Sequence, residues 1–565
     1  MKGFWKKVKN FFFPPAGAPW WIKALPYALI ILAGLFLFTT GGAAWEYTNS
    51  PQFCGTTCHT MPPEYTAYLT SPHARINCTE CHIGRGYIAT QVTRKAGDLK
   101  HVTKTLFHDY TFPITADDMR PARESCEKCH NPEKFASDSL VELKNYLPDK
   151  FNSEESTYLV LHTGGGSKRE GLGKGIHWHI ENPIYYYPTD KTEQEIPYIK
   201  VVNPDGTSTE YIDVESGLTP ETIDQSKLKE MDCITCHNRI THLVPQPEQS
   251  VDTAIGNGLI DSSIPEFRRQ AVELLRAPYT STAEAVERID SLEEFYKVYY
   301  PDYYAQNPKV IKDAVQTVQN IYTSSVYPEQ KSDWNSHPNN VGHQYSPGCF
   351  RCHDGKHVNS QGEAIRLECN LCHSIPRVAT ANNFVTNIEI SRGPEPETHK
   401  NPNWITIHRE AFNSTCKNCH STDDPGGTSN TSFCSNSACH GNVWTYAGFD
   451  APRLREILQP QMPTPEPTPE ISANAPLTYA DTVGLLLTSQ CSACHGGSTP
   501  VMGLDLTTYA GIMKGGQSGP AIVPGDSQNS LLIQKQTGTL PHFSQLNPDQ
   551  IDLIKKWIDA GAPEK

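Results

Sequence analysis

The sequence contains little apolar material for its length, because hydrophobic residues make up only 37% of its 565 residues. It also lacks a basic excess, since the formal net charge is −14 at pH 7. Phosphate binding needs a basic surface, so this charge argues against a nucleic-acid partner. The chain has 44 prolines and 39 glycines, which indicates many loops. Its length favours several domains rather than one.

No cysteine stands outside one repeated pattern. Nine times a pair of cysteines is followed at once by histidine, and these nine motifs use all 18 cysteines. Seven have two residues between the cysteines, whereas the first has three and the eighth has four. In chain order, the motifs are Cys54, Cys58 and His59; Cys78, Cys81 and His82; Cys126, Cys129 and His130; Cys233, Cys236 and His237; Cys349, Cys352 and His353; Cys369, Cys372 and His373; Cys416, Cys419 and His420; Cys434, Cys439 and His440; and Cys491, Cys494 and His495.

Two cysteines followed by histidine are the attachment pattern of haem c, with the histidine as proximal iron ligand. A disulfide framework would not need the histidines. A zinc ribbon is the better competitor, because the four cysteines of motifs five and six have a suitable spacing, but it would leave His353 and His373 unexplained. We therefore expect nine covalently bound haems. Porphyrins supply apolar surface, which predicts a mostly α and irregular, haem-packed fold despite the low hydrophobic content.

The first acidic residue is Glu46, and residues 24–45 carry no charge at all. These 22 residues are long enough to span a bilayer as one helix. The preceding segment, 1–23, holds five lysines, which should stay in the cytoplasm. A cleaved signal peptide is the alternative, with Gly42-Ala43-Ala44 as a possible cleavage site, but the length favours a retained anchor. The sequence thus predicts a protein of the bacterial cytoplasmic (inner) membrane, with its haem domains on the periplasmic or extracellular side.

The stretch from Cys54 to Gly84, directly after the anchor, contains CHTM and Ser71-Pro72-His73. It resembles the NapC/NirT/NrfH family of membrane-anchored multihaem quinol dehydrogenases over roughly the first 130 residues. Residues 126–373, with MDCITCHNRITH, GIHWH and GCFRCHDGKH, resemble the longer inner-membrane multihaem cytochromes of metal-respiring bacteria. The resemblance implies a quinol donor and Met61 as a ligand of the first iron. It also suggests a quinol site near the first motif, with Lys95, Asp98 and His101 as candidates.

Eight motifs fall in a body of residues 46–450. Within it we expect a small β insertion, because residues 196–202 and 207–212 flank the turn sequence Asn-Pro-Asp-Gly. Residues 264–322 are the most helical part, with Ser281 and Glu284 as a capping box. One apolar helical face there consists of Val310, Ile311, Ala314, Val315, Val318 and Ile321. Residues 451–476 form a Pro-rich linker, whose last 17 residues would reach roughly 50 Å when extended.

Residues 477–565 resemble a small, all-α class I monohaem cytochrome c domain. We expect it to end in a helix capped by Asn547, Pro548 and Gln550. The apolar face of that helix is Ile551, Ile554, Trp557 and Ile558. The preceding loop, GTLPHFSQL, lacks the methionine that usually ligates iron in such domains. His542 is the substitute we predict, with Met502 as the alternative.

Nine of the 22 histidines belong to motifs, which leaves thirteen for distal iron positions. His177 and His179 would share one face of an extended strand, where they could serve two neighbouring irons or one iron and a propionate. With this supply most irons can be six-coordinate, which suits electron transfer more than catalysis. The distal candidates are Met61, His73, His177, His179, His242, His343, His357, His408 and His542.

The function we expect is electron relay from membrane quinol, through the haems, to a periplasmic or extracellular redox protein or membrane complex. Whether quinol oxidation makes the chain an enzyme in its own right stays open. One alternative is a multihaem nitrite, hydroxylamine or sulfur-oxyanion reductase with one open iron, but no motif has lysine in place of its histidine. Another is a subunit of an extracellular haem filament, against which the membrane anchor argues.

Overall fold

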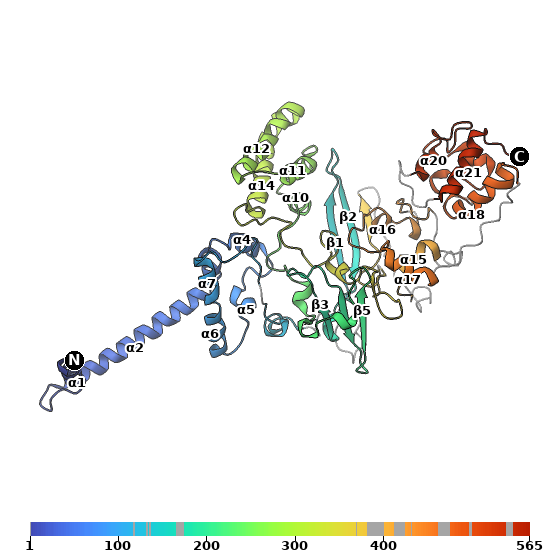
Figure 1. Ribbon diagram of the computed structural model, residues 1–565. Coiled ribbons are helices and arrows are strands. Elements are labelled where there is room, and N and C mark those ends of the chain that lie inside the picture. Colours follow the sequence, from blue (N-terminus) through green and yellow to red (C-terminus); the bar gives the residue numbers. More distant parts are fainter. Residues whose placement is uncertain are drawn as a thin grey trace.

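The computed structural model describes residues 2–116, 119–131, 134, 137–164, 175–368, 370–380, 401–411, 424–430, 432–461, 475–496, 500–537 and 546–565. Residues 462–474 of the Pro-rich linker, His542 and the whole seventh motif lie outside this part of the chain. In the described part, a long N-terminal helix projects from one end of the molecule and a small helical unit lies at the other (Figure 1).

Helix α1 (Lys2–Phe12) precedes α2 (Trp20–Asn49), an apolar helix of 30 residues. At about 1.5 Å per residue α2 is about 45 Å long, more than the roughly 30 Å of a bilayer core. Its apolar side chains are largely exposed, and Pro26 is its one buried residue. Within the described residues it is the single helix long and apolar enough to cross a membrane. The predicted apolar helix is confirmed, and it extends about one turn further at each end.

Five short helices follow the anchor: α3 (Pro51–Thr56), α4 (Pro62–Thr70), α5 (Cys78–His82), α6 (Ile88–Gly97) and α7 (Leu99–Leu106). Proline at the first position starts α3 and α4, where its missing N–H is no loss. The Ser50 side chain caps α3 by accepting from the Phe53 amide at 3.2 Å. The first two motifs therefore lie on short helical turns immediately beyond the anchor.

Two antiparallel sheets form the middle of the molecule. One has the order β1 (Ser139–Tyr146), β2 (Glu154–Leu161), β8 (Arg377–Thr380). The other has the order β6 (Lys229–Glu230), β3 (Ile184–Tyr187), β4 (Tyr198–Val202), β5 (Ser208–Asp213), β7 (His357–Val358). Strands β7 and β8 come from after the fifth and sixth motifs, so the sheets tie distant parts of the body together.

The predicted hairpin is confirmed as β4 and β5, in which Tyr198 pairs with Ile212. Gly206 adopts φ +84°, a left-handed conformation that glycine accepts without strain. The strand predicted around His177 and His179 is wrong. That segment is the short helix α8 (Trp178–Glu181), which begins directly after His177.

A helical unit comprises α10 (Pro247–Gly256), α11 (Phe267–Arg276), α12 (Thr282–Tyr299), α13 (Pro301–Gln306) and α14 (Pro308–Ser325). Its core buries Phe267, Ile289 and Ile311 completely. The apolar face predicted for α14 is confirmed. The Ser281 hydroxyl caps α12 by accepting from the Glu284 amide at 3.2 Å. The reciprocal half of the predicted capping box is wrong, because the Glu284 carboxylate accepts from the Thr280 amide instead.

The remaining helices are α9 (Cys233–Cys236), α15 (Trp404–Ala411), α16 (Ser437–His440) and α17 (Pro452–Leu458) in the body. The tail contains α18 (Gly484–His495), α19 (Tyr509–Lys514), α20 (Leu531–Gln536) and α21 (Pro548–Asp559). These tail helices enclose a separate core around Trp557. The predicted capping box of α21, between Asn547 and Gln550, is confirmed.

Candidate haem-binding sites

Short helical turns present most of the described motif cysteines. The second motif is α5, the fourth begins α9, the eighth ends α16 and the ninth ends α18. On such a turn residues three apart lie on the same face, so both thiols of a two-residue-spacer motif point the same way. None of the described cysteines forms a disulfide. This arrangement fits attachment of one porphyrin by two thioether bonds.

The first motif reaches a similar arrangement with its longer spacer. Cys54 lies on α3, and Cys58 follows two residues after the end of that helix. Thr57, between them, keeps a right-handed helical conformation, so the helical turn continues almost to Cys58. Residues four apart on a helix also lie on one face. Both thiols belong to half-buried residues and can therefore be offered to one porphyrin.

Some predicted attachment residues fall outside the part of the chain that the structure describes. These are Cys369 of the sixth motif and Cys416, Cys419 and His420, which make up the seventh. For the ninth motif the structure gives the backbone of Cys494 at the end of α18 but not its side chain. Haem attachment at Cys369, Cys416, Cys419 and Cys494, as at the other motif cysteines, stays a prediction from the sequence.

Several motif histidines are oriented by their own backbone surroundings. His373 Nδ1 lies 2.7 Å from the Ser374 carbonyl oxygen, and His495 Nδ1 lies 3.2 Å from the Leu504 carbonyl oxygen. A carbonyl can only accept, so Nδ1 must carry the proton and Nε2 keeps its lone pair. His353 makes the same kind of contact with the Arg366 carbonyl at 2.5 Å. These imidazoles are therefore in the tautomer that binds a metal through Nε2.

Four motif histidines each face a second histidine from a distant part of the chain. A metal–imidazole bond is about 2 Å long, so two nitrogens on opposite sides of one iron lie about 4 Å apart and their ring centres about 6 Å apart. The observed distances between ring centres are 6.0 Å for His73 and His130, 6.2 Å for His82 and His242, 5.6 Å for His179 and His353, and 6.3 Å for His343 and His373. The donor set therefore fits haem iron held between two imidazoles.

The fourth motif histidine, His237, lies near His177. Burial lowers the pKa of His237, and the charge of His177 lowers it further. Because α8 is a helix, residues 177 and 179 point about 200° apart. His177 accordingly approaches the fourth motif, while His179 Nδ1 bonds to the Ile176 carbonyl at 2.7 Å and its ring faces His353.

His357 lies near the motif histidine His353, but its ring nitrogens bond elsewhere. Its Nδ1 lies 2.8 Å from Asp354 Oδ1, and its Nε2 lies 2.7 Å from the Ile196 carbonyl. Both ring nitrogens are therefore engaged in hydrogen bonds in a buried site. The hydrogen bonds give this histidine a structural role that joins β7 to the segment just before β4, and its selection as a distal ligand is corrected accordingly.

The histidine of the first motif differs from those of the next five. His59 Nε2 lies 3.1 Å from the Tyr110 hydroxyl, and Met61 sits at the start of α4 with its side chain partly buried.

In α15, His408 bonds through Nδ1 to the Ile405 carbonyl at 2.5 Å and stacks on Trp404.

The thiols of successive motifs are neighbours. A shared hydrogen bond lowers the pKa of Cys54 and raises that of Cys78. In the other thiols burial raises the pKa, and a thiol of an adjacent motif raises it further. In a mature cytochrome these sulfurs are thioethers and do not titrate. The pKa shifts therefore show only which motifs lie close to one another. The neighbouring pairs are Cys54 and Cys78, Cys81 and Cys126, Cys126 and Cys233, Cys236 and Cys349, and Cys349 and Cys372. Motifs one to six thus form an unbroken series in chain order.

A buried carboxylate lies behind the second motif. Glu64 Oε2 is 3.1 Å from His242 Nδ1, and both Glu64 oxygens are 3.4 Å from Arg239 Nη2. His337 Nε2 approaches Glu64 Oε1 at 3.6 Å, and the His337 side chain is largely buried. This arrangement holds the His242 ring with Nε2 toward His82. Sequence reasoning missed Glu64, because nothing in its local pattern reveals partners 175 residues away.

At the end of the anchor, Lys95 Nζ donates to Thr48 Oγ1 and Asn49 Oδ1, both at 2.7 Å. It also lies 4.9 Å from the centre of the Trp45 ring. Burial lowers the pKa of Lys95. Asp98 joins α6 to α7, and His101 is exposed on α7. Only Lys95 of the three quinol-site candidates reaches the anchor.

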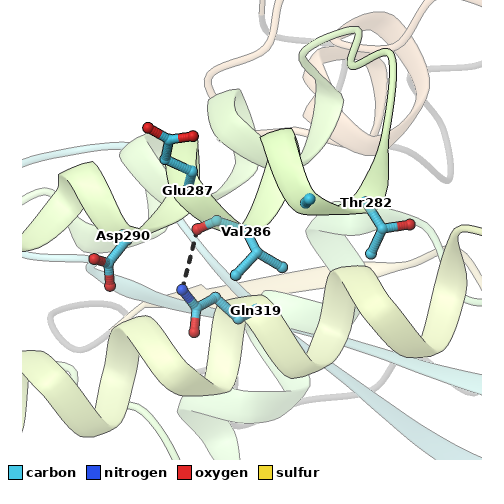
Figure 2. Close-up of a pocket in the computed structure, with 6 residues that line it drawn as sticks. Thr282, Val286, Glu287, Asp290 and Gln319 are labelled. Atoms are coloured by element: carbon cyan, nitrogen blue, oxygen red, sulfur yellow. Dashed lines mark hydrogen bonds between the residues drawn. The ribbon is translucent and has the colours of Figure 1, made fainter.

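A cavity of about 170 Å³ adjoins this place, between the end of α2 and the second motif. Its polar lining includes Asn49, Asn77, Glu80 and Gln91, with Trp45 at the membrane side. A second hollow lies between α12 and α14, where Gln319 donates to the Val286 carbonyl at 3.1 Å (Figure 2). Figure 2 shows Glu287 and Asp290 at its rim, but no cysteine or histidine lines it, so it lies away from the haem chemistry.

Comparison with known proteins agrees with this geometry. Residues 21–140 match the family model of the N-terminal region of the NapC/NirT cytochrome c family. Over 390 residues the chain is 38% identical to the cytochrome c-type protein ImcH of Geobacter sulfurreducens, covering 68% of this chain and 75% of that protein. The chain belongs to the NapC/NirT cytochrome c family. As a NapC/NirT cytochrome it is a membrane-anchored, multihaem electron-transport protein with covalently bound haem c.

Two further matches cover parts of this NapC/NirT cytochrome. Over 117 residues it is 34% identical to the cytochrome c-type protein NrfH of Wolinella succinogenes, covering 19% of this chain and 66% of that protein. Residues 491–540 match the planctomycete cytochrome c model, so a cytochrome c domain follows the NapC/NirT part. No solved structure matches the chain.

Proposed function

We propose that the chain is a nonahaem conduit that accepts electrons from quinol at the membrane and delivers them outward to a periplasmic or extracellular acceptor. The observation that carries this proposal is the unbroken series of motifs one to six, which starts at the end of the anchor. When bound, the haems supply one-electron carriers along that series. The N-terminal lysines support an orientation with the start of the chain in the cytoplasm and the motifs on the opposite side.

The proposed ligand sets follow from the histidine pairs. His242, His73, His177, His179 and His343 serve motifs two to six respectively, while Met61 remains the proposed ligand of the first. With these ligand sets, the irons of motifs two to six would have no free position for a substrate. This favours the conduit over a nitrite, hydroxylamine or sulfur-oxyanion reductase. A pyridine haemochrome assay combined with intact mass should show nine haems; seven would mean that the two long-spacer motifs are unused.

The proposed quinol site is the cavity beside Lys95 and Trp45. Quinol oxidation releases protons, so a nearby group must accept them. Among the residues that the structure describes, Lys95 is bonded to neutral oxygens and an aromatic ring, and burial lowers its pKa. We propose that Lys95, when its amine is neutral, takes a proton from the quinol, with Asp98 and His101 as the next acceptors toward solvent.

The decisive experiment is Lys95→Met in the full chain reconstituted into nanodiscs. A quinol analogue should reduce the variant at least tenfold more slowly than the parent, whereas dithionite should reduce both alike. Lys100→Met, on the neighbouring helix, is the matched control and should behave like the parent. Equal rates for Lys95→Met and the parent would contradict the proposed site.

For the tail we propose a separately folded monohaem domain of residues 477–565, tethered by the Pro-rich linker, with its haem attached to Cys491 and Cys494. His542 is the proposed distal ligand; Met502, the alternative, has a side chain that is 51% exposed. In the isolated tail His542→Ala should abolish the low-spin spectrum and open the iron to carbon monoxide. If Met502→Ala does this instead, the ligand is methionine, and the potential should be higher.

A further inference from the structure

Helices α6 and α7 bury none of their residues. Large apolar side chains on and beside them are exposed, including Tyr87 at 89% and Phe107 at 75%. The others in this patch are Ile88, Val92, Leu99, Val102 and Leu106. A contiguous apolar surface of this kind usually marks a contact with a membrane or a protein. We call these seven residues the α6–α7 patch.

The apolar residues within α7 lie on one side of that helix. In α7, Leu99, Val102 and Leu106 are spaced by three and four residues and form a single stripe, while Lys100 and Lys104 lie off it. The polar side of α6 is held to the body, because Arg94 donates to the Ile83 carbonyl at 2.9 Å and to Glu124 at 2.6 Å. The exposed apolar side chains therefore lie where the body does not cover them.

The position of the patch relative to the anchor shows what covers it. Lys95, on α6, bonds to Thr48 and Asn49, one turn beyond Trp45 in α2. Tryptophan gathers at membrane–water interfaces, so Trp45 marks the level of the lipid headgroups. In Figure 1 both helices lie beside this end of α2 and turn across its axis. A membrane crossed by α2 would meet α6 and α7 along its surface.

We propose that α6 and α7 lie in the outer surface of the membrane, with the α6–α7 patch inserted into the lipid at the boundary between headgroups and acyl chains. Amphipathic helices with lysine on the polar side bind lipid surfaces in this way and favour anionic headgroups. Lys100 and Lys104 supply that charge. The proposal rests on the α2 anchor and stands whether or not Lys95 contacts quinol.

The test uses thiol accessibility, since every native cysteine belongs to a haem motif and a single introduced cysteine would be the one free thiol. Val102→Cys probes the patch. Val298→Cys on α12 is the matched control, because the two valines are 59% and 60% exposed in the structure. Each full-length variant is placed at one copy per nanodisc of phosphatidylcholine and phosphatidylglycerol. It then reacts with a charged maleimide that does not enter lipid, and the product is followed by mass.

We expect residue 102 to react at least tenfold more slowly than residue 298, and Lys100→Cys on the polar side of α7 to react at nearly the control rate. Leu106→Cys is the second patch variant if Val102→Cys fails to show the parental haem spectrum. Equal rates at residues 102 and 298 would overturn the proposal. So would protection at residue 102 that appears only when two copies share a disc, because a second copy would then be the occupant.

Discussion

The helical unit α10–α14 and the region of the first three motifs bury their residues in different ways. The helical unit has an apolar core that includes Phe267, Ile289 and Ile311, all fully buried. Between Cys54 and His130, by contrast, the described buried apolar side chains are Ala67, Tyr68, Ile83 and Ala122. Histidine pairs separated by the width of a metal site occupy the motif region instead. The first region can fold on side chains alone, whereas the second needs porphyrin to supply its apolar interior.

The largest effect should come from preventing attachment at the third motif. The double variant Cys126→Ser, Cys129→Ser cannot attach the haem proposed to lie between His73 and His130. The region around these two histidines therefore loses the stabilisation that bound haem gives to the folded state. Limited proteolysis with mass spectrometry should show rapid cleavage between residues 54 and 130, while α10–α14 stays protected. The double variant Cys434→Ser, Cys439→Ser in the eighth motif should leave residues 54–130 protected. Equal protection in all three proteins would contradict this comparison.

A substitution in the helical unit should do the reverse. Ile311→Ala leaves a cavity in a fully buried site and should destabilise this unit by about 2–5 kcal/mol. Hydrogen exchange should report the loss in α10–α14, with the haem spectrum unchanged. Val298→Ala, at an exposed position on α12, should change stability by no more than about 0.5 kcal/mol. A shifted haem spectrum in Ile311→Ala would mean that the two regions are coupled.

Glu64→Gln should have a smaller effect, confined to the second motif. The variant keeps the shape of the side chain but removes a buried negative charge beside His242. That charge favours ferric iron, so its loss should raise one reduction potential by about 60 mV, a tenfold change in a one-electron equilibrium. Spectroelectrochemical titration measures this shift. Glu248→Gln, whose carboxylate pairs with Arg276 in the helical unit, should shift no potential.

The smallest effect concerns His357. Burial alone would lower its pKa, but the hydrogen bond to Asp354 and the charges of Asp354 and Asp213 outweigh it, so the net shift is upward. A raised pKa in the folded state stabilises the fold fully below the unfolded pKa of about 6.5 and loses that contribution as pH rises through the folded value. Unfolding by denaturant should therefore show a body that is more stable at pH 6 than at pH 9. His357→Gln should reduce this difference; an unchanged pH dependence would exclude His357 as its source.

Local patterns in the sequence predicted local structure well. The Asn-Pro-Asp-Gly turn, the apolar face of α14 and the cap at Asn547 depend on neighbours within a few residues, and all three are confirmed. The anchor followed from a run without charge. The segment of His177 and His179 was misassigned because its alternation of polar and apolar residues fits a strand as well as a single helical turn.

The arrangement of the sites could not be predicted, because it depends on contacts between distant segments. His179 and His353 are 174 residues apart, and their spacing in the chain holds no signal of their pairing. The same holds for Glu64 and Arg239. His357 was misread because its position four residues after a motif histidine resembles that of a ligand, whereas the partners that engage its ring come from its own turn and from the residues just before β4.

The central claim is that motifs two to six hold six-coordinate iron between paired histidines in a path that begins at the membrane. Spin counting by electron paramagnetic resonance on the oxidised, full-length protein tests it most directly. The account predicts that low-spin iron accounts for at least five haems, with any high-spin signal attributable to the first, seventh, eighth or ninth motif through variants of those motifs. The contradicting result would be a low-spin count below five together with a high-spin signal that does not change in His242→Ala, His73→Ala or His343→Ala. That result would exclude the histidine pairs and the conduit built on them.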